Sequence, residues 1–88
     1  MNISLDVPEY DAVRGLRFEW EDGFEVTVDV DGSEVHLSAN QAGLISLARH
    51  LLTLAQAAVP SGHHVHLTAD QEINSDIDLI IEKNEDLA

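Results

Sequence analysis

Several residue types are absent or scarce in this chain, and each absence excludes a class of function. There are no cysteines, so disulfides, thiolate metal sites and cysteine nucleophiles are excluded. Aromatic residues make up only 5% of the chain, so a core must consist mainly of Leu, Ile, Val and Ala. Apolar runs are too short to cross a bilayer, and the opening MNISLDVPEY lacks the features of a secretory signal. We therefore expect a cytoplasmic protein.

Basic residues are scarce as well. Four Lys and Arg residues stand against 17 Asp and Glu residues, which gives a formal net charge of −13. This charge repels phosphate backbones and anionic lipids, so neither nucleic acid nor a membrane is expected as a partner. It attracts and steers a basic protein partner. The alternative is that the acidity serves solubility or a salt-rich habitat, since Lys83 is the single lysine.

The length of 88 residues fits one domain. Apolar and polar residues alternate over 16–20, 24–30 and 35–37, which predicts three strands with one apolar face. Asp22-Gly23 and Asp31-Gly32 predict type I′ hairpin turns between them. Residues 1–15 would add a short strand and a loop.

Residues 40–58 predict one amphipathic helix, with Ser38 or Asn40 as its N-cap. One stripe is expected to face the sheet: Leu44, Leu47, Ala48, Leu51, Leu54, Ala55 and Ala58. The opposite side would carry Arg49, His50, Thr53 and Gln56. Ile45 and Leu52 widen the apolar stripe. Either the core contact is broad, or these two residues form an oligomer contact, as in a homodimer.

Two more strands are predicted at 63–68 and 77–83, on either side of a polar loop at 69–76. The expected fold class is therefore α+β. It consists of an antiparallel sheet of about five strands in β-β-β-α-β-β order, with the helix on one face. The acidic tail 84–88 is expected to fray.

The face of the sheet that the helix leaves uncovered is the candidate partner-binding surface. Like charges on a rigid sheet repel one another, which favours a counter-charge from a partner. The residues expected on this face are Glu19, Glu25, Asp29, Glu34, His36, His64, His66, Asp78 and Glu82.

Three histidines on that face also suggest a metal site. His64 and His66 are two residues apart on a strand, so their rings project from one face, and His36 would join them. The alternative is that they are simply exposed histidines. Neither a nucleophile elbow nor a phosphate-binding glycine loop is present, so we expect no catalytic residue, no enzyme activity and no cofactor.

A family resemblance covers residues 38–83. An Asn-x-x-Gly-Leu helix start precedes a Leu- and Ala-rich helix, a Pro-x-Gly break, a His-x-His-Leu strand and NSDIDLIIEK. This order resembles the predicted bacterial polymorphic-toxin immunity proteins classed as the immunity protein 32 family. The resemblance implies an α+β protein without enzyme activity that binds and neutralises a cognate toxin. The matching positions are Asn40, Gly43, Leu44, Gly62, His64, His66, Leu67 and Ser75.

Overall fold

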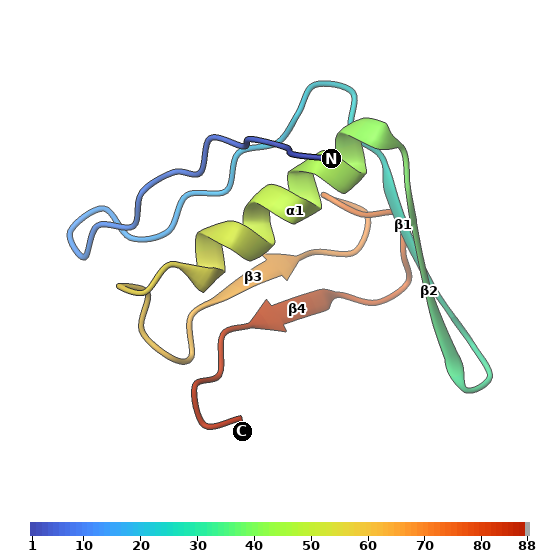
Figure 1. Ribbon diagram of the computed structural model, residues 1–88. Coiled ribbons are helices and arrows are strands. Elements are labelled where there is room, and N and C mark those ends of the chain that lie inside the picture. Colours follow the sequence, from blue (N-terminus) through green and yellow to red (C-terminus); the bar gives the residue numbers. More distant parts are fainter. Residues whose placement is uncertain (88) are drawn as a thin grey trace.

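The computed structural model describes residues 1–87 and has an α+β fold. Within these residues the elements are β1 (Val26–Asp31), β2 (Glu34–Ala39), α1 (Gln41–Ala55), β3 (His64–Leu67) and β4 (Leu79–Glu82). They form two separate antiparallel sheets, β1–β2 and β3–β4, with α1 against β3 and β2 (Figure 1). The α+β class is thus confirmed. The prediction of about five strands in one sheet, in β-β-β-α-β-β order, is wrong.

The missing strand is residues 16–20, which are extended but belong to neither sheet. Leu16, Phe18 and Trp20 do turn toward the core as predicted. Just beyond them, however, the chain is held by a helix side chain, because the Glu21 N–H donates to Ser46 Oγ at 2.8 Å. Because the helix holds the chain here, residues 16–20 have no neighbouring strand with which to form the hydrogen bonds of a sheet.

Both predicted type I′ turns are also wrong. At Asp22-Gly23, only Gly23 has a positive φ, at 76°, and a type I′ turn needs two such residues. The second turn is shifted by one residue, because Asp31 pairs with Glu34. Its central residues are therefore Gly32 and Ser33, and the φ of 60° at Gly32 alone is the pattern of a type II′ turn. The extra strand predicted in residues 1–15 is likewise not formed.

The helix is rotated about its axis relative to the prediction. Leu47 and Leu54 face the core, but so do Ser46, His50 and Thr53. The two buried hydroxyl groups donate to carbonyls of their own helix, at Ala42 O and Arg49 O, and hydroxyl groups satisfied in this way can be buried at little cost. Four residues predicted to face inward on the helix are exposed instead: Leu44, Ala48, Leu51 and Ala55.

Asn40 caps the helix as predicted, and it also ties α1 to the segment before β1. Its Oδ1 accepts the Gly43 N–H at 2.8 Å and the Glu25 N–H at 3.0 Å. Its Nδ2 donates to Gly23 O at 2.8 Å. At the other end of α1, Lys83 Nζ donates to the carbonyl oxygens of the C-cap residue Gln56 and of Val59, at 2.8 and 2.7 Å.

The loop 69–76 links the two sheets and is less polar than predicted. Ile73 in this loop is 1% exposed and belongs to the core. Beside it, the backbone of Asn74 exchanges hydrogen bonds with Val26 and Val28 of β1, at 2.8 and 3.0 Å. The core therefore joins residues of α1, both sheets and this loop: Val26, Val28, Leu47, Leu54, Val65, Leu67 and Ile73.

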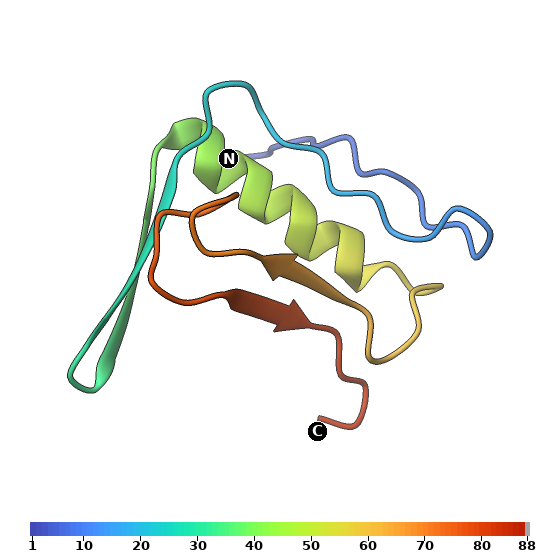
Figure 2. The same ribbon diagram turned by 180° about the vertical axis from the view of Figure 1, so that it is seen from behind.

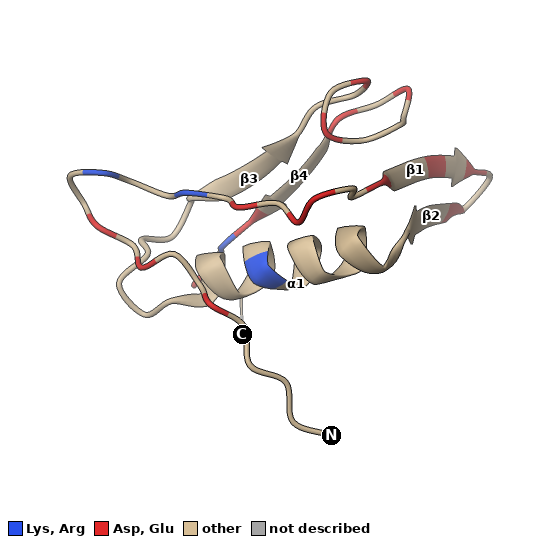
Figure 3. Ribbon diagram, turned by 90° about the horizontal axis from the view of Figure 1, so that it is seen from above, with Lys and Arg blue, Asp and Glu red and all other residues tan. Residues whose placement is uncertain are grey.

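Residues 6–10 run along the outside of α1 (Figure 2), and the first residues of the chain project away from the helix (Figure 3). Arg49 Nε donates to Asp6 O at 3.0 Å, and Gln56 bonds both Tyr10 N and Pro8 O at 2.9 Å. At the other terminus, the Glu85 N–H donates to Ser61 Oγ at 3.1 Å; Ala88, the last residue of the predicted fraying tail, lies outside the described residues. In the described part of the chain, no helix is long and apolar enough to cross a membrane.

Candidate partner-binding site

The residues predicted to share one face of a sheet lie at separate places in the structure. Glu19 lies on the extended segment 16–20, and Glu25 precedes β1. Asp29, Glu34 and His36 lie on the β1–β2 hairpin. The remaining four belong to β3, β4 or the residue before β4: His64, His66, Asp78 and Glu82. The single predicted face is divided because the two sheets are separate.

The exposed face of the β1–β2 hairpin carries alternating acidic residues. Asp29 pairs with His36 across the two strands, and Asp31 pairs with Glu34. His36 Nε2 lies 2.7 Å from Glu34 Oε2. All four side chains are exposed, so a partner can reach three carboxylates and one imidazole on this face.

The second cluster surrounds Asp78, just before β4. Its Oδ2 lies 2.7 Å from His66 Nε2, and its Oδ1 accepts the Ala69 N–H at 2.8 Å. The backbone N–H of Ala69, followed by His66, lowers the pKa of the Asp78 carboxyl. These hydrogen bonds thus stabilise the ionised form of Asp78.

The histidines do not form a metal cluster. The rings of His64 and His66 are 6.4 Å apart, while His36 lies on the other sheet beside Glu34. In residues 1–87, no group of three or more His, Asp or Glu side chains is arranged to hold a metal ion.

The first part of β1 and the loop 69–78 lie side by side, because Thr27 of β1 bridges to Asn74, and the tip of the hairpin projects beyond the loop (Figures 1 and 2). We call this part of the molecule the acidic end. In Figure 3, both its segments carry Asp or Glu positions and neither carries a Lys or Arg position. It comprises Asp29, Asp31, Glu34, Asp70, Glu72, Asp76 and Asp78.

A crevice opens where the two segments of the acidic end meet. It is lined by Val28, Asp29, Val30, Ser75, Asp76 and Ile77, and its volume is about 120 Å³. Three apolar residues and two aspartates thus contribute to its lining. This combination suits the apolar stem and charged head of a Lys or Arg side chain.

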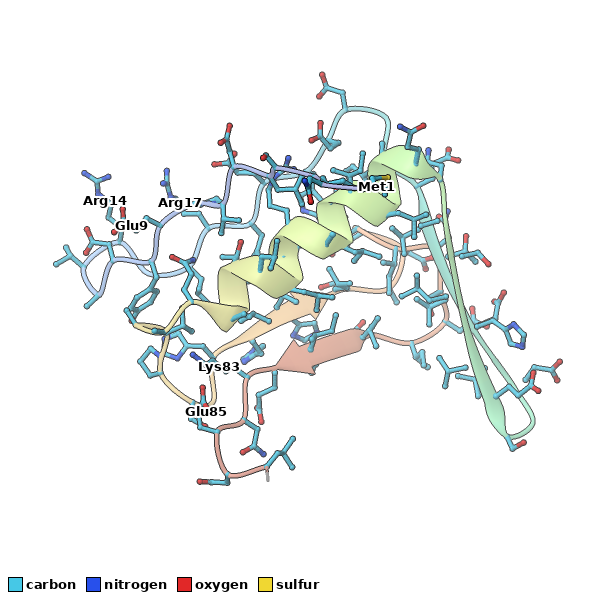
Figure 4. All side chains as sticks on the ribbon, in the orientation of Figure 1. Met1, Glu9, Arg14, Arg17, Lys83 and Glu85 are labelled. Carbon is cyan, nitrogen blue, oxygen red and sulfur yellow. The ribbon has the colours of Figure 1, made fainter. Side chains whose placement is uncertain are left out.

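The four basic residues lie elsewhere. Arg14 and Arg17 lie on the N-terminal loop, away from the acidic end (Figures 3 and 4). Arg49 pairs with Glu21 at 2.7 Å, and Lys83 lies 3.3 Å from Glu85. Across residues 1–87, Glu21 and Glu85 are the only carboxylates within 4.0 Å of a Lys or Arg nitrogen. Within residues 1–87, the acidic end therefore has no Lys or Arg counter-charge.

The predicted oligomer contact consists of two residues in different surroundings. Ile45 is half-buried and lines a shallow hollow with Glu21 and Asp22. Leu52 is 49% exposed. Their participation in a subunit contact remains a prediction.

His50 was predicted to lie on the polar side of the helix, but this histidine is fully buried. Its ring meets the rings of Phe18 and Trp20 edge-on, with centroid distances of 5.2 and 4.4 Å. Neither ring nitrogen has a hydrogen-bond partner. Burial, with a smaller contribution from the charge of Arg49, lowers its pKa to about 4. The burial of His50 could have been inferred from its spacing, because Leu47, His50 and Leu54 share one helical face.

The structure explains two positions of the sequence motif. Asn40 bonds both the first turn of α1 and the segment before β1, as described above. Gly43 is needed because a Cβ there would lie 2.6 Å from the Glu25 carbonyl oxygen. Asn-x-x-Gly is therefore the local requirement for α1 to begin directly against the start of β1.

Comparison with known proteins supports the same motif. The model of the family described as Immunity protein 32 matches residues 34–84, more than half of the chain. The search of curated proteins and the search of solved structures found no match. The match includes Asn40, Gly43, Gly62, His64 and His66, and it confirms the resemblance expected for residues 38–83. The chain belongs to the immunity protein 32 family.

Proposed function

We propose that this protein is a non-enzymatic immunity protein that binds and neutralises a cognate bacterial toxin with a basic surface. Family membership supports the class of function. The observation that carries the proposal is the acidic end, where seven carboxylates of the hairpin and the loop 69–78 have no Lys or Arg partner from the chain.

The acidic end carries negative charge that no Lys or Arg of residues 1–87 compensates. Neighbouring carboxylates repel one another in the free protein, and a basic partner would relieve that repulsion while being steered to the site. The bound protein would inhibit the toxin by covering its active site or by occupying the place of a polyanion. Neither route requires a reaction in the immunity protein.

The residues proposed for the toxin contact are assigned by their positions in the two sheets. Asp29, Glu34 and His36 would contact the toxin from the hairpin, and His66 and Asp78 from the neighbouring sheet. Glu19, Glu25, His64 and Glu82 would lie around this contact. The crevice between Asp29 and Asp76 would accept a basic side chain of the toxin.

Co-expression tests the proposal. The toxin encoded by the neighbouring gene should stop growth of a bacterial host, and this chain should restore growth. The double variant Asp29→Asn with Asp31→Asn should lose protection, because it removes two charges from the acidic end.

The matched control removes two charges from the opposite loop, through Glu9→Gln with Asp11→Asn, and should still protect. Failure of the wild-type chain to restore growth would overturn the proposed function. Equal protection by the two double variants would instead show that the acidic end is not the contact.

A further inference from the structure

One face of α1 carries apolar side chains that nothing in residues 1–87 covers. Leu44 is 56% exposed and Leu51 is 49% exposed, and Ala48 and Ala55 are exposed on the same side. Their spacing of four, three and four residues places them in one stripe along the helix. Contiguous exposed apolar surface is typical of interaction sites.

The stripe borders a groove, because α1 covers β3 but covers β4 incompletely. Val65 and Leu67 of β3 are buried, whereas their cross-strand partners Ile81 and Leu79 are only half-buried. The groove is lined by Leu51, Leu54, Ala55, Ile81, Glu82 and Lys83, and its volume is about 210 Å³. Its floor is thus apolar.

Lys83 lies at the end of this groove, below the last turn of α1 (Figure 4). Its ammonium group is occupied by the Gln56 and Val59 carbonyl oxygens. The side chain is 11% exposed, so the groove presents little positive charge that would repel a basic partner.

The outer edge of β4 is open along the groove. Within residues 1–87, β4 pairs only with β3. The Lys83 N–H donates to His63 O at 2.8 Å, so by antiparallel alternation the backbone groups of Ile80 and Glu82 point toward the open edge. An unpaired edge of this kind can accept an additional strand.

The charges around this edge determine whether an acidic or a basic strand can pair with it. Glu82 lies on the edge strand, and Asp76 and Asp78 precede it. Carboxylates at an edge oppose pairing with another acidic chain, and a second copy of this protein would carry the same net charge of −13. A basic segment would instead be attracted.

We propose that the groove between α1 and β4 receives an extended, basic segment of the toxin, which adds a strand to the open edge of β4. The inference rests on the proposed function and adds a second contact to it. Residues 76–82 connect the acidic end to the groove, so one toxin surface can reach both. Charge at the acidic end provides attraction, and apolar burial along Leu51 and Ile81 slows dissociation.

The test uses the neighbouring toxin domain, inactivated by substitution, as the probe for binding by calorimetry. Leu51→Gln should weaken binding at least ~10-fold, because a buried contact is lost. Leu52→Gln is the matched control, because Leu52 is an adjacent residue with the same 49% exposure and does not line the groove. It should leave affinity unchanged within about 2-fold.

A second variant tests the edge itself. Ile80→Pro removes an N–H that points away from β3, so the β3–β4 ladder is retained. It should also weaken binding, and in the wild-type complex hydrogen exchange at Ile80 and Glu82 should slow.

The outcomes separate the inference from the proposed function. If the wild-type chain does not bind the toxin domain, the proposed function fails and the inference fails with it. If it binds, but Leu51→Gln and Leu52→Gln bind equally well, only the inference is overturned. The inference is also overturned if the free protein is a dimer that Leu51→Gln alone dissociates, because the occupant is then a second copy.

Discussion

Asn40 holds three parts of the chain together through one side chain: the first turn of α1, Glu25 and Gly23. Its role as a helix cap could be predicted from its position before an apolar helical stripe. Its bonds to the segment before β1 could not, because no local pattern shows which backbone groups will approach a cap in the folded chain.

Asn40→Ala should lower the free energy of unfolding by about 2 kcal/mol, because the cap and the second accepted bond are both lost. Asn40→Asp keeps the accepting oxygen and loses only the donation to Gly23 O, so its loss should be smaller, about 1 kcal/mol. Urea unfolding of both variants measures the difference. Equal losses would contradict the role assigned to Oδ1.

His50 makes folding stability depend on pH. Its pKa is about 4 in the folded protein against an ordinary 6.5, so the unfolded chain binds a proton more readily between these values. The stability due to neutral His50 is complete above pH 6.5 and is lost as pH falls toward about 4. Carboxylates also titrate in this range, so a comparison with a variant is needed.

The variant His50→Leu should therefore lose less stability on acidification than the wild-type chain, because leucine does not bind a proton. The carboxylates contribute alike in both proteins. Thermal unfolding at several pH values between 6.5 and 4 measures the two slopes. Indistinguishable slopes would show that burial does not hold this histidine neutral.

At the scale of elements, the existence and the approximate ends of α1, β3 and the hairpin could be predicted from periodicity and turn residues. The rotation of α1 about its axis could not be predicted in this way. Leu44 and Leu51 made the predicted core stripe, whereas Ser46 and Thr53 are buried in their place. Their hydroxyl groups are satisfied within the helix, and a hydrophobicity pattern does not register that compensation.

Gly43→Ala tests the close approach of α1 to the segment before β1. Alanine normally favours a helix over glycine by ~1 kcal/mol. Here its Cβ would lie 2.6 Å from the backbone oxygen of Glu25, so the substitution should instead cost about 2 kcal/mol. Urea unfolding measures the change. Ala48→Gly on the exposed side is the control, with a loss of ~1 kcal/mol, and a stabilising Gly43→Ala would contradict the packing.

At the scale of the molecule, acidity and family could be recognised from the sequence, but the shape of the candidate site could not. The predicted single face required one sheet. Instead, Glu21, which follows the extended segment 16–20, binds the helix, and Asn74 pairs with β1. These long-range contacts divide the sheet and bring Asp29 and Asp76 to one crevice, which no spacing in the sequence indicates.

The central claim is that charge at the acidic end binds a basic toxin. The most direct measurement is the Kd for the inactivated neighbouring toxin domain, determined by calorimetry across a range of salt concentrations. Between about 0.05 and 0.5 M NaCl the affinity should fall at least ~10-fold, because salt screens exposed charges. A Kd that does not change with salt would contradict the claim.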